Sequence, residues 1–274
     1  MHAATLPHAN VGSLIRQWRQ RRHLSQLDLA CEADISTRHL SYVETGRSSP
    51  SREMLMHLAE RLNVPLRERN QLLAAAGFAP IYRERPLSDP ALAPARQAVD
   101  LVLKGHEPYP ALAVDRHWNM LAHNRTVPLL LANVDPEMLK PPVNVLRLSL
   151  HPRGLAKRIV NLAQWREHLF LRLKHQIDQS ADPVLVDLLH ELQAIPFDAS
   201  QSHGPAIDPA GLAVPLQFNT EMGVMSFIST TTVFGTPVDV TLSELALETF
   251  FPADDHTAEL LRRLGDGQGA PGQR

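Results

Sequence analysis

The chain has 274 residues, an apolar fraction of 44% and a formal net charge of −2. This length allows two domains, each with its own core, and the composition excludes a fibrous or wholly disordered chain. No uninterrupted apolar run reaches the roughly 18 residues that a membrane-spanning helix needs, and the N-terminus lacks the pattern of a secretory leader. The single cysteine, Cys31, excludes an internal disulfide framework. We therefore expect a cytoplasmic protein with no membrane partner.

The two parts of the chain differ in charge. Residues 1–85 carry 12 Arg, no Lys and 8 Asp plus Glu, a net charge of +4. The remaining residues carry 15 basic and 21 acidic side chains, a net charge of −6. The N-terminal part can therefore approach a polyanion that the rest of the chain would repel.

Apolar residues at helical spacing predict five short helices within residues 11–76, in a domain that spans residues 1–78. Ser25 and Ser36 are placed to cap the second and third of these helices, and Gly46 is placed to end the third. The break between the second and third helices is only a few residues long. This layout is typical of a DNA-binding helix-turn-helix.

The second helix of a helix-turn-helix lies in the major groove, where its first turn and its outward residues reach base edges. Arg38 can make a bidentate contact to guanine, whereas Gln26 and Arg47 are placed to contact the phosphate backbone. The predicted DNA-binding residues are Gln26, Ser36, Thr37, Arg38, Ser41, Tyr42 and Arg47. The alternative is a helical bundle in which these side chains are merely solvated.

The module resembles the Xre family, the lambda-repressor-like type of helix-turn-helix. The resemblance rests on Ser25-Gln26, Leu29-Ala30, Ile35-Ser36, Leu40-Ser41, Val43-Glu44, Gly46-Arg47 and Pro50-Ser51. It implies that Glu44 forms a structural ion pair with Arg19 inside the module. Asp34 departs from the family, which commonly has glycine in this turn, but aspartate tolerates a left-handed conformation better than most residues.

Four prolines between residues 79 and 94 predict a semi-rigid linker, and a second domain is expected over residues 95–260. A Gly-rich tail over residues 265–274 has no apolar face and is predicted to be disordered. The expected helices of the second domain cover about 95–104, 125–131, a long stretch through 155–177, and 184–192. Strands are expected at 111–114 and 118–123, and in LAVPLQFN, GVMSFISTTTVF and LALETFF after Gly211.

This second part resembles the ligand-binding domain of MmyB-like transcription regulators. The resemblance rests on YPALAVDRHWNMLAHNR, NVLRLSLHPRGLAKRIVNLAQW and FGTPVDVTLSELALETFFPADDHT. It implies an α+β chain with a PAS-like C-terminal domain, in which a five-stranded antiparallel sheet carries a helical insert. It also implies a cavity that can hold a fatty-acyl chain.

A long acyl chain needs an apolar sleeve and one polar group for its head. The sleeve candidates are Trp118, Met120, Trp165, Leu169, Phe218, Met225 and Phe227, and the candidates for the head are Arg147, His151 and Arg172. For each apolar residue, the alternative is an ordinary place in the core.

The sequence contains no Walker loop, GxGxxG, GxSxG or HExxH motif, so we predict no enzyme, no catalytic residues and no cofactor besides a possible bound fatty acid. The 14 histidines lack a third ligand at sensible spacing, so no metal is expected. We expect a homodimeric regulator that binds a two-fold site on double-stranded DNA and senses a small apolar ligand. The alternatives are a lipid-binding or small-molecule enzyme domain tethered to DNA, and an interaction module whose cavity stays empty.

Overall fold

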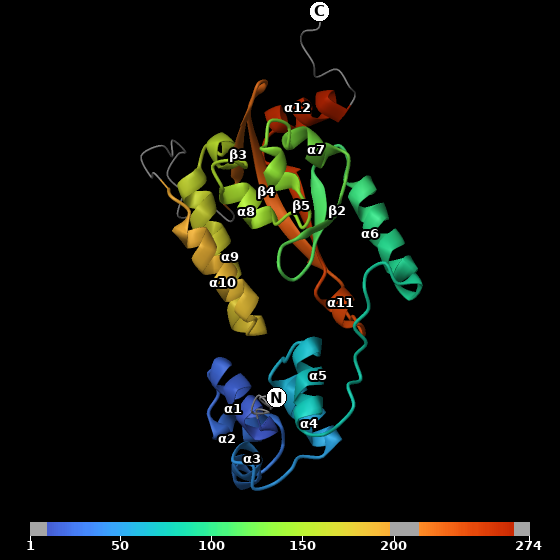
Figure 1. The fold of residues 1–274 in the computed structure, drawn as a ribbon, viewed down its shortest axis with the longest axis vertical. Helices are drawn as coiled ribbons and strands as arrows, with labels where there is room; N and C mark the ends of the chain where they lie inside the picture. Colours follow the sequence, from blue (N-terminus) through green and yellow to red (C-terminus); the bar gives the residue numbers. More distant parts are fainter. Residues whose placement is uncertain (1–9, 198–213, 266–274) are drawn as a thin grey trace, which may run out of the picture. The chain divides into compact units, whose positions relative to one another are not determined.

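The computed structural model describes residues 10–197 and 214–265. The chain divides into two compact units (Figure 1). The first comprises the chain up to Arg85 with two short later segments, Asp178–Ala181 and Val238–Val240, and the second comprises the rest. The tail predicted to be disordered, residues 265–274, lies outside the described residues except for Gly265, which ends the last helix.

Five short helices form the first unit, which confirms the predicted helical module. They are α1 (Val11–Arg21), α2 (Gln26–Glu32), α3 (Thr37–Glu44), α4 (Arg52–Arg61) and α5 (Leu66–Ala75). Each helix contributes fully buried side chains to a single core, among them Ile15, Leu29, Leu40, Leu55 and Leu72. The polar faces left over by this packing are available for function.

Two hydroxyl caps define where the helices of the motif begin. Ser25 and Asp28 form a reciprocal capping box at α2, with Asp28 N donating to Ser25 Oγ at 3.1 Å and Ser25 N donating to Asp28 Oδ2 at 2.9 Å. At α3, Ser36 Oγ accepts from His39 N at 3.1 Å. These caps hold the two helices at the short turn that joins them.

A left-handed residue ends both helices of the motif. Asp34 follows α2 with φ of 51°, and Ile35 N donates back to Ala30 O at 3.0 Å. Gly46 follows α3 with φ of 73°, and Arg47 N donates back to Tyr42 O at 2.8 Å. Both turns have the hydrogen bonds of a Schellman motif, in one case with aspartate where glycine is usual.

The first helix passes very close to the end of α3. A Cβ atom built on Gly12 would lie 2.1 Å from the carbonyl oxygen of Val43, so no larger residue fits there without displacing backbone. This close approach lets Arg19 of α1 reach Glu44 of α3.

The second unit is an antiparallel sheet with helices on both faces. Its strands are β1 (Ala111–Val114), β2 (Met120–His123), β3 (Leu216–Thr220), β4 (Gly223–Val233) and β5 (Ala246–Pro252). The strand order is β2-β1-β5-β4-β3, with each neighbouring pair antiparallel. The α+β class and the five antiparallel strands predicted from the sequence are thus confirmed.

The α-helices of this unit range from the four residues of α11 to the 19 residues of α9, and three 3-10 turns lie among them. They are η1 (Pro90–Leu92), α6 (Ala93–Gly105), α7 (Thr126–Leu130), η2 (Pro136–Leu139), α8 (Val145–Leu150), η3 (Ala156–Arg158), α9 (Leu162–Ser180), α10 (Pro183–Ala194), α11 (Val240–Ser243) and α12 (Asp255–Gly265). Among the described residues, none of the helices is both long and apolar enough to cross a membrane.

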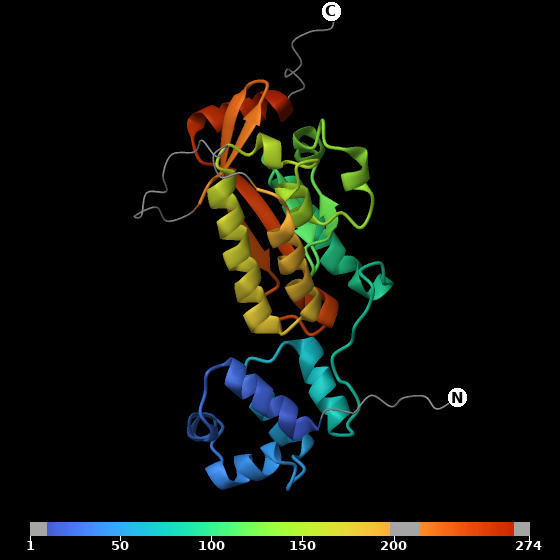
Figure 2. The same cartoon turned by 60° about the vertical axis from the view of Figure 1, so that its left-hand side comes forward.

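Alternate residues along the strands join two different cores. Helix α6 covers one face of the sheet, and α9 and α10 cover the other (Figures 1 and 2). On one face, Ala111 and Ala113 of β1 pack with Val99 and Leu103 of α6. On the other face, Leu112 and Val114 join the larger core, to which α9 and α10 contribute Trp165, Leu169, Leu173 and Leu185. The candidate ligand site lies on this second face.

The prediction of one long helix through residues 155–177 is wrong at its start. Helix α9 begins only at Leu162, after the 3-10 turn η3. Between the two, Ile159 forms an isolated bridge to Phe218, and Val160 N donates to Gln217 O at 2.8 Å. This segment therefore pairs with β3. The spacing of its apolar residues fits a helix as well as a turn, so it could not predict this pairing.

Candidate DNA interface and ligand cavity

Two arginines, one on α3 and one in the turn after it, lie around a tyrosine of α3. Arg38 Nε donates to Tyr42 Oη at 3.1 Å, and the Arg38 guanidinium lies 5.4 Å from the centre of the Tyr42 ring. Arg47, placed by the Gly46 turn, lies 5.9 Å from the same ring. Among the described residues, nothing bonds the two terminal nitrogens of Arg38, so its fork remains free for a bidentate contact.

The other predicted DNA-binding residues lie on or beside α3. Thr37 and Ser41 are half-exposed, and Ser36 is exposed although its hydroxyl already serves as the helix cap. Gln26, in the first turn of α2, donates its side-chain amide to Glu44 Oε2 at 2.8 Å. Its amide oxygen and the first-turn N–H groups of α2 are the parts that a phosphate could meet.

Arg19 and Glu44 form a buried bidentate pair. Arg19 Nε lies 2.6 Å from Glu44 Oε1, and Arg19 Nη2 lies 2.9 Å from Glu44 Oε2. Only 8% of Arg19 and 6% of Glu44 is exposed. Burial alone would raise the pKa of Glu44, but hydrogen bonds from Arg19 and Gln26 and the charges of Arg19 and Arg16 outweigh it, so this pKa lies below its ordinary value.

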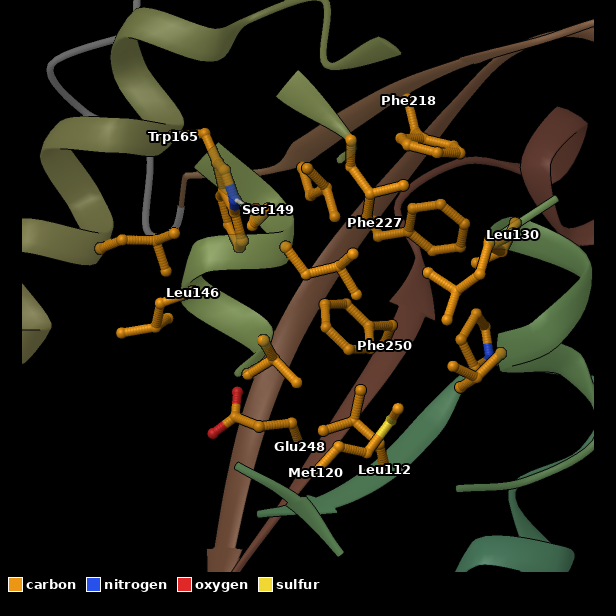
Figure 3. A pocket seen from close by; sticks show the side chains of 18 of the residues that line it. Leu112, Met120, Leu130, Leu146, Ser149, Trp165, Phe218, Phe227, Glu248 and Phe250 are labelled. Carbon is orange, nitrogen blue, oxygen red and sulfur yellow. Dashed lines mark hydrogen bonds between the residues drawn. The ribbon is translucent and has the colours of Figure 1, made fainter. Parts of the chain in front are cut away.

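A cavity opens beneath the sheet of the second unit, between all five strands and the helices α7, α8 and α9 (Figure 3). Its empty volume, with the open mouth included, is about 880 Å³. Apolar side chains from all these elements line it, among them Leu112, Met120, Leu130, Leu146, Trp165, Phe218, Phe227 and Phe250. A sleeve of this kind suits a long aliphatic molecule.

Three polar side chains, Arg172, Glu248 and Ser149, interrupt the apolar wall. Arg172 forms a bidentate pair with Glu248, with Nη2 to Oε1 at 2.8 Å and Nη1 to Oε2 at 3.1 Å. Thr231 Oγ1 accepts from Arg172 Nη2 at 2.7 Å and donates to Glu248 Oε1 at 2.7 Å. The third polar side chain, Ser149, accepts a hydrogen bond from Trp165 Nε1 at 2.9 Å.

Seven of the ten predicted cavity residues lie in the wall. They are Trp118, Met120, Trp165, Leu169, Arg172, Phe218 and Phe227. The other three do not line it. Arg147 is paired outside with Glu191 at 2.6 Å, His151 follows α8 and accepts from Arg153 N at 3.0 Å, and Met225 is fully buried in the core.

Other residues that line the cavity were not predicted from the sequence, among them Ser149, Glu248 and Phe250. For two of them, the alternation in β5 could have indicated the position. Glu248 and Phe250 point to the cavity face of the sheet, whereas Leu247, just before Glu248, joins the core on the opposite face. A charged residue on an apolar face is itself a sign of function or of a buried partner. Ser149 had no such signal, because its position depends on the orientation of the six-residue helix α8.

Trp118 lies in the cavity wall with an unusual backbone. Its φ is 67°, in the left-handed region that a bulky residue rarely adopts. Its ring is held on both sides, because Nε1 donates to Gln176 Oε1 at 2.7 Å and the Arg172 guanidinium lies 4.8 Å from the ring centre. The sequence predicted a strand that begins at residue 118. The left-handed conformation of Trp118 explains why β2 begins only at Met120.

Histidines do not assemble into a metal site in the described part of the chain, where no three His, Cys, Asp or Glu side chains are placed to hold an ion. His117 pairs instead with Asp182, with Nε2 to Oδ2 at 2.9 Å. His168 stacks on Trp165 with ring centres 5.2 Å apart.

Comparison with known families agrees with both halves of this geometry. Residues 15–69 match a helix-turn-helix family, and residues 95–264 match the MmyB-like transcription regulator ligand binding domain. No curated protein gives a significant match. Because the second match covers more than half of the chain, and because both matched domains are those of transcription regulators, the chain belongs to the MmyB-like transcription regulators.

Proposed function

We propose that this regulator reads a specific sequence in double-stranded DNA through α3 and alters its DNA affinity when an aliphatic ligand of the fatty-acyl class fills the cavity. The observation that carries the proposal is the apolar cavity, which lies in the same chain as a helix-turn-helix with a free arginine fork. A preformed sleeve with an apolar lining and few polar groups is what lipid-like ligands require, which supports the proposal.

In the DNA-binding unit, base contacts are assigned to Thr37, Arg38, Ser41 and Tyr42, and backbone contacts to Gln26, Ser36 and Arg47. A homodimer would place two copies of α3 on a two-fold site, with half-sites about 34 to 36 Å apart. Arginine to guanine is the commonest specific contact in the major groove, which supports Arg38 as the main reader.

The proposal is tested by measuring ligand and DNA binding on the same sample. Native mass spectrometry of the purified full chain should show an intact aliphatic molecule retained on the protein. Its removal should change the affinity for a duplex selected from a random pool, because a ligand can act only through a difference in affinity between two states. An unchanged DNA affinity would contradict sensing, and turnover of the bound molecule would favour an enzyme.

A further inference from the structure

The charged groups of the cavity wall already neutralise each other. Arg172 is bound at both terminal nitrogens by the Glu248 carboxylate, and Glu248 is only 4% exposed. A ligand carboxylate that took Arg172 would leave Glu248 buried without its counter-charge. Leaving one member of a buried pair alone is strongly unfavourable, so Arg172 is a poor anchor for an acid.

The neighbouring histidine does not supply a replacement cation. His168 lies one turn before Arg172 on α9 and contacts the ring of Trp165. Burial, together with the nearby charge of Arg172, lowers the pKa of His168, so its ring is neutral at and above neutral pH. His168 is also absent from the cavity lining, so among the described lining residues a ligand carboxylate would meet the Glu248 carboxylate and an arginine that is already paired.

Ser149 offers a different kind of anchor. Its Oγ accepts from Trp165 Nε1, which fixes the oxygen in the wall, but within the described residues nothing accepts its hydroxyl proton. Figure 3 shows Ser149 beside Trp165 among the apolar side chains of the wall. A neutral donor of this kind can satisfy one carbonyl oxygen, but a single hydroxyl is far too little to stabilise a buried charge.

We propose that the cavity selects an uncharged fatty-acyl derivative, such as an ester, lactone or amide, over a free fatty acid. This inference rests on the proposed function, which assigns an aliphatic ligand to the cavity. The carbonyl oxygen of this ligand accepts a hydrogen bond from Ser149. The Arg172–Glu248 pair closes the wall and excludes a second carboxylate.

Three probes of equal chain length test the headgroup preference. Delipidated full-length protein is titrated at pH 8 with dodecanoate, methyl dodecanoate and dodecane delivered from cyclodextrin, in competition with a bound fluorescent probe. The ester should bind at least about tenfold more tightly than the ionised acid. The hydrocarbon reports the contribution of the chain alone.

Two cavity variants separate the roles of charge and hydroxyl. Glu248→Gln removes the negative charge and leaves a single amide oxygen to accept from Arg172, so the guanidinium charge is no longer compensated, and dodecanoate should gain about tenfold or more while the ester changes little. Ser149→Ala should weaken the ester about tenfold and leave dodecane nearly unchanged. Glu191→Gln is the matched control, because Glu191 pairs with Arg147 outside the cavity wall. Thermal unfolding checks that each variant is folded.

The outcomes distinguish this inference from the proposed function. If wild-type protein binds dodecanoate as tightly as the ester, or if Ser149→Ala weakens ester and hydrocarbon equally, the headgroup inference is wrong and the aliphatic cavity stands. If none of the three probes binds, the proposed ligand class fails and the inference fails with it.

Discussion

Glu44 shows how one buried side chain ties the DNA-reading helix to its scaffold. It accepts hydrogen bonds from Arg19 of α1 and Gln26 of α2 while belonging to α3. Removing one member of such a buried pair costs about 3 to 5 kcal/mol. We expect Glu44→Ala to lower the free energy of unfolding by this amount, measured by urea denaturation of the first unit.

The same carboxylate gives a pH signature. Since the folded-state pKa of Glu44 is lowered, its stabilisation is fully present above the unfolded pKa of about 4.3 and is lost as pH falls through the folded value. The stability difference between wild type and Glu44→Gln should therefore be constant above about pH 5 and shrink in acid. The exposed Glu60→Gln on α4 is the control, expected within about 0.5 kcal/mol of wild type because it removes no buried partner. A difference that does not depend on pH would contradict the assignment.

Asp34 holds a backbone conformation that suits glycine better. Its φ of 51° carries a steric cost for an L-residue, which aspartate reduces but does not remove. We expect Asp34→Gly to raise the free energy of unfolding by about 0.5 kcal/mol, since relief of strain is partly offset by the greater freedom of glycine in the unfolded chain. Gly46→Ala should act in the opposite direction, because its φ is 73° and the new Cβ would lie 2.5 Å from Asn10 Nδ2. Differential scanning calorimetry compares the two, and a destabilised Asp34→Gly would show that the aspartate side chain itself holds the turn.

Arg38 and Arg47 should respond differently to removal. The free fork of Arg38 fits a base edge, so Arg38→Ala should cost about 1 to 3 kcal/mol at one base position and relax specificity there. Arg47 follows the helix, and its removal should weaken all duplexes alike and reduce the salt slope by about one. Selection from random duplexes gives the specificity, and anisotropy titrations give the slope. An unchanged sequence profile for Arg38→Ala would show that another residue reads the base.

At the scale of helices and strands, a feature was predictable from the sequence when the residues that cause it lie close to it in the chain. The motif helices were predictable because Ser25, Ser36 and Gly46 act on backbone groups a few residues away. The break before α9 was not, because Ile159 and Val160 are held by β3, almost 60 residues later. The large apolar side chains of the cavity wall, such as Trp118, Trp165 and Phe227, were predicted, but most of its aliphatic residues were not, and its polar members Ser149 and Glu248 depend on contacts between elements.

Helix α7 offers a way to fill the cavity without disturbing the core. Leu130 lines the cavity and is only half-buried. Leu130→Trp should therefore fill part of the cavity and should lower the stability of the fold only slightly. Binding of an aliphatic probe should fall by about tenfold or more, as measured by fluorescence competition. Leu129→Trp, on the neighbouring exposed position, is the matched control and should bind normally. Equal binding by both variants would place the ligand elsewhere.

At the scale of the whole molecule, the sequence predicted two folded parts and their classes, because each part has its own hydrophobic pattern. Residues 11–78 supply nearly all of the first core, and residues 112–264 supply the largest core of the second. The path of the chain through the second unit was less predictable. Its sheet places β5 between β1 and β4, an order that depends on packing and not on local sequence.

The division of charge predicts that the acidic second part weakens binding of the first part to DNA. Residues 1–85 carry a net +4 and the rest a net −6, so a fragment of residues 1–85 should bind a nonspecific duplex more tightly than the full chain at low salt. Both proteins present the same α3, so on a duplex too short to hold two copies the difference should come from long-range repulsion. Salt of about 0.5 M, at which the Debye length is only a few ångströms, should remove it. Anisotropy titrations over a range of salt concentrations measure both curves. A difference that persists at high salt would instead mean that the second unit alters the DNA-binding surface itself.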